Sequence, residues 1–360
     1  MKSLRLDVEN LNLLVFKEQE VPELTEGMAL VKVQAAALNR RDFWIREGKY
    51  PGIKPDITLG SDGCGIVEVV ADEEHKEWIN KEVIINPNIN WGDVEEHQSQ
   101  DYRILGMPDD GTFAEYIIVG IDRLSEKPKH LDVYQAAALP LAGLTAYRAV
   151  FTHAAVKKDD VVLVSGFGGG VAQFAFQFCV AVGAQVYVTT SSESKLKKAK
   201  ELGAINGVNY KTENWHKTLK EMSGGFTHVV DSAGGDQVNT IIKTMRPAGR
   251  YVFYGASLGL PKNIDLYRVF YNQIRIQGTT MGSDKEFGAM IDFVNEHKIF
   301  PIVDSVIPFE NALKAFEKMK KGEQMGKIVL SIARPVQGGN KLQESVSKIK
   351  DFFKGMWGNN

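Results

Sequence analysis

The feature that most constrains this chain is a glycine-rich turn between an apolar run and a helical pattern. Residues 161–172 read VVLVSGFGGGVA, which is a short apolar run, a cluster of glycines and then the start of a helix-like periodicity. Glycines let the backbone approach a ligand closely, and a helix N-terminus offers free N–H groups and a partial positive charge. This order of elements is typical of a site for the pyrophosphate group of a dinucleotide.

The glycine spacing departs from the usual G-x-G-x-x-G fingerprint, because the motif here is Gly166-x-x-Gly169-x-x-Ala172. A turn of this kind can also be purely structural. The context favours the ligand site. Residues 161–164 predict a strand, and residues 171–182 repeat their apolar side chains at the spacing of one helical face.

The region from about 128 to 281 alternates short apolar runs with helical patterns. We expect helices that include 171–182, 195–202 and 238–245, and strands at 161–164, 185–190, 227–231, 250–254 and 274–278. Apolar strands that alternate with helices predict a parallel sheet covered on both faces, the α/β class. Residues 1–125 look β-rich instead, with strands expected at 29–35, 65–70, 82–85 and 113–119 and a long polar loop at 86–110.

The length of 360 residues exceeds what one hydrophobic core usually spans, so we expect two domains. The net charge of −2 argues against nucleic acid as a main partner. Two cysteines are too few for a disulfide framework or a four-cysteine zinc site, and they favour a cytoplasmic setting. The sequence shows neither a signal-peptide pattern nor an apolar stretch long enough to span a membrane.

The segment 335–360 forms a separate amphipathic tail. Leu342, Val346, Ile349 and Phe353 recur on one helical face, with lysines around it. We expect this helix to dock on the protein or on a second subunit. A membrane-surface helix is the alternative.

The end of the second strand in the α/β region decides between NAD and NADP. In NAD enzymes an acidic residue there binds the ribose hydroxyls. Thr190 stands at that position here, followed by Ser191, Ser192 and Lys195. Hydroxyl groups and an ammonium suit a 2′-phosphate through charge-assisted hydrogen bonds, which favours NADP(H). The serines could instead cap the next helix, and the two roles are compatible.

The chain resembles the medium-chain dehydrogenase/reductase superfamily from about Leu30 to Ile332, in particular its zinc-free quinone oxidoreductase-like, enoyl reductase-like and zinc-type alcohol dehydrogenase-like members. Besides the glycine turn, the resemblance rests on the order and spacing of several segments. These are AALNRRDFW (36–44), LGSDGCGIV (59–67), DGTFAEY (110–116), AAALPLAGLTAYRAV (136–150), KAKELGA (198–204), VVDSAGG (229–235), GRYVFYGA (249–256), IQGTTMGS (276–283) and MGKIVL (325–330).

The resemblance implies a Rossmann doubly wound parallel sheet inserted in a chaperonin-10-like β-barrel domain. The barrel would comprise residues 1–127 and 282–334, and the nucleotide-binding domain residues 128–281. Relatives bind substrate in a cleft between these domains. Relatives are also commonly dimers joined at the edge of the nucleotide-domain sheet, so we expect a homodimer by analogy, joined near 274–278.

The same resemblance argues against a bound metal. Zinc-bearing relatives place a Cys at the position of Asn39, a His-Glu pair at Ser61-Asp62 and a third ligand near Leu141. Amide and hydroxyl groups are not normal zinc ligands, and leucine offers none. Without zinc, alcohol oxidation lacks its Lewis acid. Zinc-free relatives typically reduce quinones or carbon–carbon double bonds conjugated to a carbonyl, and we expect NADPH-dependent chemistry of this kind.

Hydride addition to such substrates builds negative charge on a carbonyl oxygen, which fixed donors must stabilise. Asn39 and Tyr50 match family positions near the nicotinamide, and Trp44 replaces a residue that is often tyrosine there. Asn39 could instead serve a turn or barrel hydrogen bond. For the cofactor, the resemblance implies Gly168, Gly169, Gly170 and Val171 at the pyrophosphate, Tyr210 near the adenosine phosphate, and Ser232, Gly255, Ala256, Gly278 and Thr279 near the nicotinamide half.

Two other functions stay open from the sequence. The chain could bind NADP(H) without catalysis, in a regulatory or structural role. It could also be a zinc alcohol dehydrogenase, which a bound zinc ion would reveal.

Overall fold

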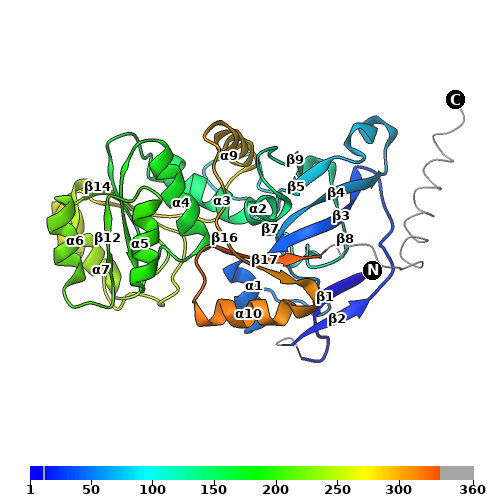
Figure 1. Ribbon diagram of the computed structural model, residues 1–360, viewed down its shortest axis with the longest axis horizontal. Coiled ribbons are helices and arrows are strands. Elements are labelled where there is room, and N and C mark those ends of the chain that lie inside the picture. The colour runs from blue at the N-terminus through cyan, green and yellow to red at the C-terminus, as the bar shows by residue number, and fades with distance from the viewer. Residues whose placement is uncertain (11–12, 333–360) are drawn as a thin grey trace, which may run out of the picture. The chain divides into compact units, whose positions relative to one another are not determined.

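The computed structural model describes residues 1–10 and 13–332 (Figure 1). Contacts between Cα positions divide the chain into two compact units. Among the described residues, unit 1 contains 1–10, 13–141, 303–323 and 327–332, and unit 2 contains 142–302 and 324–326. The tail helix expected over 335–360 lies outside the described residues.

Unit 2 is built on a six-stranded parallel sheet (Figure 1). The strand order is β12-β11-β10-β13-β14-β15, which is the arrangement of doubly wound dinucleotide-binding sheets. The bounds are β10 Val161–Val164, β11 Gln185–Thr190, β12 Asn206–Asn209, β13 Phe226–Asp231, β14 Met245–Phe253 and β15 Arg275–Gly278. The strand order reverses between β10 and β13, and ligands of such sheets bind outside the carboxyl ends of these two strands.

Helices connect the strands of this sheet. Their bounds are α4 Gly170–Ala181, α5 Glu193–Glu201, α6 Trp215–Ser223, α7 Gln237–Ile242 and α8 Leu266–Tyr271, and α9 Asp284–Glu296 follows the last strand. Helix α4 follows the glycine turn directly and buries Phe174 and Phe178, as its periodicity predicts. The helix expected over 238–245 ends earlier, at Ile242, because Met245 already begins β14.

The helical region predicted over 134–151 is divided at Pro140. Helix α2 (Val133–Ala138) precedes the proline, and helix α3 (Pro140–Tyr147) begins with it and continues as a π-helix over Arg148–His153. Proline has no N–H to donate but suits the first turn of a helix, so it ends one helix and starts the next.

Unit 1 consists mainly of antiparallel strands. Its largest sheet has the order β16-β17-β3-β4-β5-β9, and β8 also pairs with β3. The bounds are β1 Lys2–Leu6, β2 Leu14–Glu18, β3 Met28–Ala37, β4 Asp62–Val70, β5 Glu82–Ile85, β6 Asn88–Ile89, β7 Arg103–Ile104, β8 Tyr116–Gly120, β9 Leu124–Glu126, β16 Val303–Pro308 and β17 Lys327–Ser331. Strand β17 pairs antiparallel with β3, so the returning chain completes this unit. This confirms the predicted chaperonin-10-like domain with an inserted α/β sheet.

Helices of unit 1 pack on its apolar core. They are α1 Arg40–Arg46, α2 and α10 Ala312–Lys321, with 3-10 turns at Glu73–Trp78, Ile121–Arg123 and Phe309–Asn311. Helix α10 contributes Ala312, Ala315, Phe316 and Met319 to the core. Helix α1 is not apparent from the sequence because its seven residues, RRDFWIR, show too few helical turns for a periodic pattern.

Two positions in the family segments of unit 1 require glycine, because another stretch of backbone passes close to them. A Cβ atom on Gly111 would lie 2.0 Å from the carbonyl oxygen of Gly60, and one on Gly65 would lie 2.2 Å from that of Lys32. No side chain fits at these distances, so both positions require glycine.

The boundaries of the units differ from the predicted 127/128 and 281/282. Unit 1 extends to Leu141, because α2 packs against β3, β4 and β17. It resumes only at Val303, because α9 belongs to unit 2. There Glu286 Oε2 of α9 lies 2.6 Å from Nη1 of Arg148 in a buried ion pair. The segment 324–326 also belongs to unit 2, where Gly326 N–H donates to the carbonyl of Gly168 (3.0 Å).

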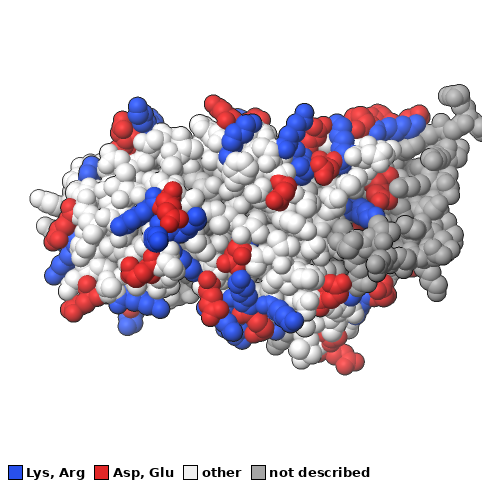
Figure 2. Space-filling model, in the orientation of Figure 1, with Lys and Arg blue, Asp and Glu red and all other residues white. Residues whose placement is uncertain are grey.

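Charged side chains of both signs are interspersed on the face seen in Figure 2. The mixture agrees with the net charge of −2 in the sequence. Within residues 1–10 and 13–332, no helix combines the length and the apolar character that crossing a bilayer requires.

Candidate functional site

The glycine turn of unit 2 leaves the start of α4 open to a ligand. Gly166 has a φ of +65°, and its carbonyl accepts a hydrogen bond from Gly169 N–H (3.0 Å). Gly169 is the N-cap residue, so the N-cap position has no side chain to take up the first amide groups of the helix. The Gly169 N–H is thus used within the turn, while Gly168, Gly170 and Val171 of the predicted pyrophosphate residues present their backbone N–H groups at the positive end of the α4 dipole.

A buried carboxylate fixes the strand ends around this turn. Asp231, at the end of β13, is fully buried and accepts hydrogen bonds from the Ser165 hydroxyl and the Tyr251 hydroxyl (2.8 Å), as well as from the N–H groups of Ala233 and Gly234 (both 3.1 Å). Burial and the neighbouring carboxylate raise the pKa of Tyr251, so the phenol stays protonated and donates. The carboxylate thus ties β10, β13 and β14 together at the edge where the ligand is expected.

The predicted ribose residues lie at the carboxyl end of β11. Lys195 Nζ donates to the carbonyl of Gln324 (2.8 Å), and it lies 2.9 Å from where a Cβ on Gly168 would be. The ammonium is therefore beside the glycine turn. Tyr210 N–H donates to the carbonyl of Thr190 (2.9 Å), which places the tyrosine next to the same strand end.

The serines after β11 do not cap α5 with their side chains. Ser192 is the N-cap residue, but it makes no side-chain capping hydrogen bond, and its hydroxyl pairs with that of Ser194 (2.7 Å). Ser191 precedes it and is half-buried. Glu193 is exposed, as a phosphate-binding site would require. Ser192 therefore occupies the capping position, as that alternative has it, but without a capping hydrogen bond from its side chain.

The residues expected near the nicotinamide follow β13, β14 and β15. A Cβ on Gly166 would lie 3.3 Å from Ser232 Oγ, and one on Gly255 would lie 3.2 Å from Ser232 O, so the segments that follow β10, β13 and β14 lie together. Ala256 approaches the same place, since a Cβ on Gly234 would lie 3.1 Å from its Cα. After β15, Gly278 leads into Thr279, whose hydroxyl oxygen is buried and has no hydrogen-bond partner among the described residues.

Unit 1 contains a second polar cluster, centred on a buried lysine. Lys327 Nζ, at the start of β17, lies 2.5 Å from Asn39 Oδ1 and 2.8 Å from Asp62 Oδ2. Asn39 Nδ2 donates to the same Asp62 oxygen (2.9 Å), and Asp62 Oδ1 accepts from Leu141 N–H (2.8 Å). Only 6% of Asn39, 4% of Lys327 and none of Asp62 is exposed, so these bonds form away from bulk water.

A second carboxylate lies beside this cluster. Asp42 Oδ2 accepts from Asn39 N–H (2.7 Å), which holds Asn39 at the start of α1. Its other oxygen is buried with no hydrogen-bond partner among the described residues. Burial raises the pKa of Asp42 to about 6, and the charges of Arg41 and Lys327 oppose that shift.

The other predicted catalytic residues lie on or near α1. Arg41 links Tyr50 to Ser61, the residue before Asp62 of the cluster. Its Nε lies 3.4 Å from the Tyr50 hydroxyl, and its Nη1 donates to Ser61 Oγ (2.7 Å). It also donates to the carbonyls of Leu105 and Met107, which anchors the end of the long polar segment. Trp44 contacts Phe43 at 5.1 Å between ring centroids and packs against the core of unit 1.

Comparison with known proteins decides the family. Residues 25–129 match the family described as "Alcohol dehydrogenase GroES-like domain", and residues 170–296 match the family "Zinc-binding dehydrogenase". The chain is 36% identical over 324 residues to the zinc-type alcohol dehydrogenase-like protein YogA of Leptosphaeria maculans, which covers 84% of this chain and 90% of that protein. The chain belongs to the medium-chain dehydrogenase/reductase superfamily.

Further members of this superfamily show the same relationship. The zinc-type alcohol dehydrogenase-like protein C1773.06c of Schizosaccharomyces pombe is 35% identical, covering 88% of this chain and 94% of that protein. A crystal structure of an NAD-dependent alcohol dehydrogenase superposes with a TM-score of 0.87 at 34% identity, covering 92% of this chain and all of that one. A crotonyl-CoA carboxylase/reductase structure gives 0.85 at 26% identity, covering 97% and 92%.

The residues of this chain at the positions where zinc-bearing relatives have their ligands do not fit a zinc ion. Across residues 1–10 and 13–332, no three His, Cys, Asp or Glu side chains gather in a way that could hold a metal. Asn39 and Asp62 converge instead on the Lys327 ammonium, and Leu141 contributes only its N–H. A buried positive charge in that place repels a metal cation.

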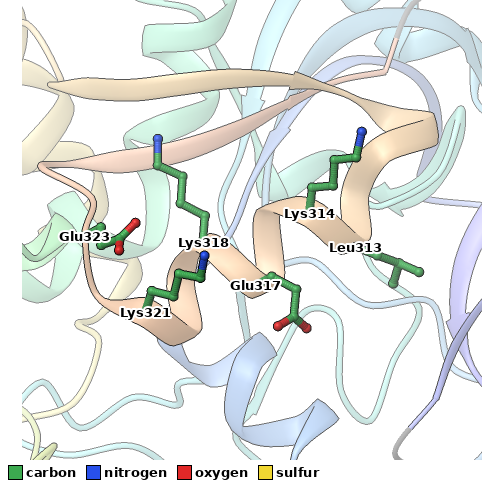
Figure 3. A pocket seen from close by; sticks show the side chains of 6 residues that line it. All are labelled: Leu313, Lys314, Glu317, Lys318, Lys321 and Glu323. Atoms are coloured by element: carbon green, nitrogen blue, oxygen red, sulfur yellow. The ribbon is translucent and has the colours of Figure 1, made fainter.

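A hollow of about 420 Å³ on unit 1 is a separate feature (Figure 3). Its lining comes from α10 and the residues after it: Leu313, Lys314, Glu317, Lys318, Lys321 and Glu323. Lys318 is paired with Asp304, and Glu317 with Arg46, so part of this charge is already compensated. None of the predicted site residues lines it.

Sequence reasoning missed three residues that organise the two clusters. The sequence marks Lys327 only as part of the MGKIVL segment, and Asp62 only as the residue at the glutamate position of the His-Glu pair in zinc-bearing relatives. Asp231 was noted only within VVDSAGG. The available signal was a charged residue inside or at the end of an otherwise apolar strand, because burial of an unpaired charge is too costly to occur without a partner.

Proposed function

We propose that this protein is an NADPH-dependent reductase that transfers a hydride to a quinone or an α,β-unsaturated carbonyl without a metal ion. The observation that carries the proposal is the Asn39–Asp62–Lys327 cluster, which puts an ammonium among the positions where zinc-bearing relatives have their ligands. Such a cluster supplies fixed hydrogen-bond donors in place of a Lewis acid.

The choice of NADPH rests on this chain's own residues. Strand β11 ends in Thr190 rather than in an acidic residue, and Lys195 lies beside the glycine turn. The hydroxyl of Ser192 does not cap α5, so it can serve a phosphate. A relative from Saccharolobus solfataricus, 28% identical, is named an NAD-dependent alcohol dehydrogenase, so the phosphate preference needs a direct test.

A bound reduced nicotinamide would supply the hydride. We assign Gly168 to Val171 to the pyrophosphate, Thr190, Ser191, Ser192, Lys195 and Tyr210 to the adenosine side, and Ser232, Gly255, Ala256, Gly278 and Thr279 to the nicotinamide half. The buried, unpartnered hydroxyl of Thr279 supports the last assignment, since a ligand there would satisfy it.

The unit 1 residues act on the substrate oxygen. As hydride reaches the β-carbon of an enone, the π electrons shift and negative charge builds on the carbonyl oxygen. We assign the Asn39 amide and the Tyr50 hydroxyl to stabilise that charge, and we assign Trp44 an apolar contact with the substrate. A proton from water at the α-carbon completes the saturated product.

The test measures binding and turnover separately. Thermal shift and fluorescence titration should show tighter binding of NADPH than of NADH, because a ligand raises the stability of the state that binds it. NADPH oxidation should then be followed with a panel of quinones and enones. Binding without turnover on any acceptor would favour the non-catalytic NADP(H)-binding role, and one tightly bound zinc per chain would favour the alcohol dehydrogenase.

We also propose that two copies of the chain form a dimer through unit 2. Strand β15 is the edge of the parallel sheet, and the segment before it exposes a run of large apolar side chains: Leu258, Leu260, Ile264, Leu266, Tyr267, Phe270 and Tyr271. Leu260 is 87% exposed, which is unusual for an apolar side chain within such a run. In analytical ultracentrifugation the wild type should sediment as a dimer, and the variant Leu260→Glu/Phe270→Glu as a monomer.

A further inference from the structure

The lysine of the unit 1 cluster is placed to control the Asn39 amide. An ammonium group only donates hydrogen bonds, so the Asn39 atom that faces Lys327 must be the carbonyl oxygen. This fixes the amide so that Nδ2 points to Asp62, where one of its two hydrogens is used. The second Nδ2 hydrogen has no acceptor among the described residues.

The charges of the cluster make this arrangement rigid. Asp62 is fully buried and accepts from Lys327, from Asn39 and from Leu141 N–H. The three side chains come from β17, the start of α1 and the start of β4, so each is held by a different element. A positive charge 2.5 Å from the amide oxygen draws electron density from the amide and makes its N–H a stronger donor.

We propose that Lys327 is a positioning residue of the reaction: paired with Asp62, its ammonium holds and polarises the Asn39 amide, so that the remaining amide N–H donates to the substrate oxygen. It thereby supplies, through an amide, the positive charge that zinc supplies in metal-dependent relatives. This inference rests on the proposed function, since it assumes a substrate oxygen that gains negative charge.

The test removes the charged pair as a unit, because Lys327→Met alone leaves a buried carboxylate unpaired. In Asp62→Asn/Lys327→Met, kcat should fall about 100-fold, the usual effect of losing one preorganised oxyanion donor. The KM for the acceptor and the Kd for NADPH should stay within about threefold. Lys327→Arg should retain at least about a tenth of the wild-type kcat. The matched control is Lys32→Met/Glu68→Gln, which neutralises a different lysine–carboxylate pair, between β3 and β4, and should leave kcat unchanged.

A double-mutant cycle tests the route through Asn39. If Lys327 acts through that amide, adding Asp62→Asn/Lys327→Met to Asn39→Ala should lower kcat by less than about threefold further. Losses that multiply to about 10⁴-fold would overturn the proposal. So would a full wild-type kcat in Asp62→Asn/Lys327→Met, because the pair would then be only structural.

A readout without turnover separates this inference from the proposed function. In protein labelled with ¹⁵N-asparagine, the Asn39 side-chain amide signal is the one lost in Asn39→Ala. It should shift between Asp62→Asn and Asp62→Asn/Lys327→Met, which differ only in the lysine, and should not shift in the Lys32→Met/Glu68→Gln control. An unmoved signal would overturn the inference. If the signal moves but no acceptor is reduced, the proposed function fails while the positioning contact stands.

Discussion

The glycine turn of unit 2 and the Asn39–Asp62–Lys327 cluster of unit 1 are built in opposite ways. The turn is made of backbone, within one short stretch of sequence around Gly166 to Val171. The cluster is made of one amide and two charged side chains, which are 23, 265 and 288 residues apart in pairs. One site is local and offers free N–H groups, and the other is long-range and already uses most of its hydrogen bonds.

This difference predicts two kinds of response to mutation. Backbone groups that await a ligand contribute little to folding, so changes at the turn should reduce cofactor affinity more than stability. Buried charges that satisfy one another are part of the fold, so changes in the cluster should reduce stability as well as activity.

The largest expected effect is on the stability of unit 1. Lys327→Met leaves the carboxylate of Asp62 buried without its counter-charge, which should lower the free energy of unfolding by about 3–5 kcal/mol. Adding Asp62→Asn removes the unpaired charge and should recover most of that loss. Chemical denaturation of the two variants checks this. Equal stability of Lys327→Met and wild type would mean that the cluster is as dispensable for folding as the turn.

The contrast also explains how much the sequence could predict. The glycine turn and the α/β alternation follow from local patterns, and the return of the chain's end to the N-terminal domain follows from the family resemblance. The structure bears out this fold. The cluster could not be predicted, because no spacing relates Asn39 to Lys327, and the pairing depends on β17 lying next to β3. The short helix α1 was missed for a related reason, since only tertiary packing stabilises so short a helix.

The next effect is the pH dependence of the stability that Asp42, the carboxyl beside the cluster, contributes. The pKa of Asp42 is raised by burial from 3.8 to about 6, so the folded state holds this proton more tightly than the unfolded chain does. Its contribution to stability should therefore fall as the pH rises from about 4 to about 6, by about 3 kcal/mol, and stay lost above that range.

Replacing Asp42 by asparagine tests whether its carboxyl group holds a proton in the folded protein. Asp42→Asn removes the titrating group while keeping an acceptor for Asn39 N–H, so the difference in unfolding free energy between variant and wild type should change across pH 4–6. Unfolding curves at several pH values measure it. A constant difference across that range would mean that Asp42 does not hold a proton in the folded protein.

A smaller effect, on cofactor affinity rather than on stability, is expected when Lys195 beside the glycine turn is replaced. Lys195→Met should weaken NADPH binding by about 10- to 100-fold, the range for losing a hydrogen bond to a charged group, and leave NADH binding unchanged. Lys197→Met, an exposed lysine two residues along the same helix, is the matched control. Fluorescence titration with both nucleotides measures the ratio. Equal losses for NADPH and NADH would show that Lys195 contacts a phosphate common to both cofactors.

The smallest effect should come from one methyl group in the turn itself. A Cβ on Gly168 would lie 2.9 Å from Lys195 Nζ and 3.0 Å from the Gln324 carbonyl oxygen, in the space that a pyrophosphate would approach. Gly168→Ala should weaken binding of both nucleotides about tenfold, about 1.4 kcal/mol, because the methyl group keeps the phosphates from the amide groups. The unfolding free energy should change less than this, because the lysine end can move and the Gln324 carbonyl has to shift by only a few tenths of an ångström. Gly288→Ala, where a Cβ meets nothing within 4 Å, is the control. If Gly168→Ala lowers stability while nucleotide affinity holds, the turn is a folding element like the cluster, and the distinction between the two sites fails.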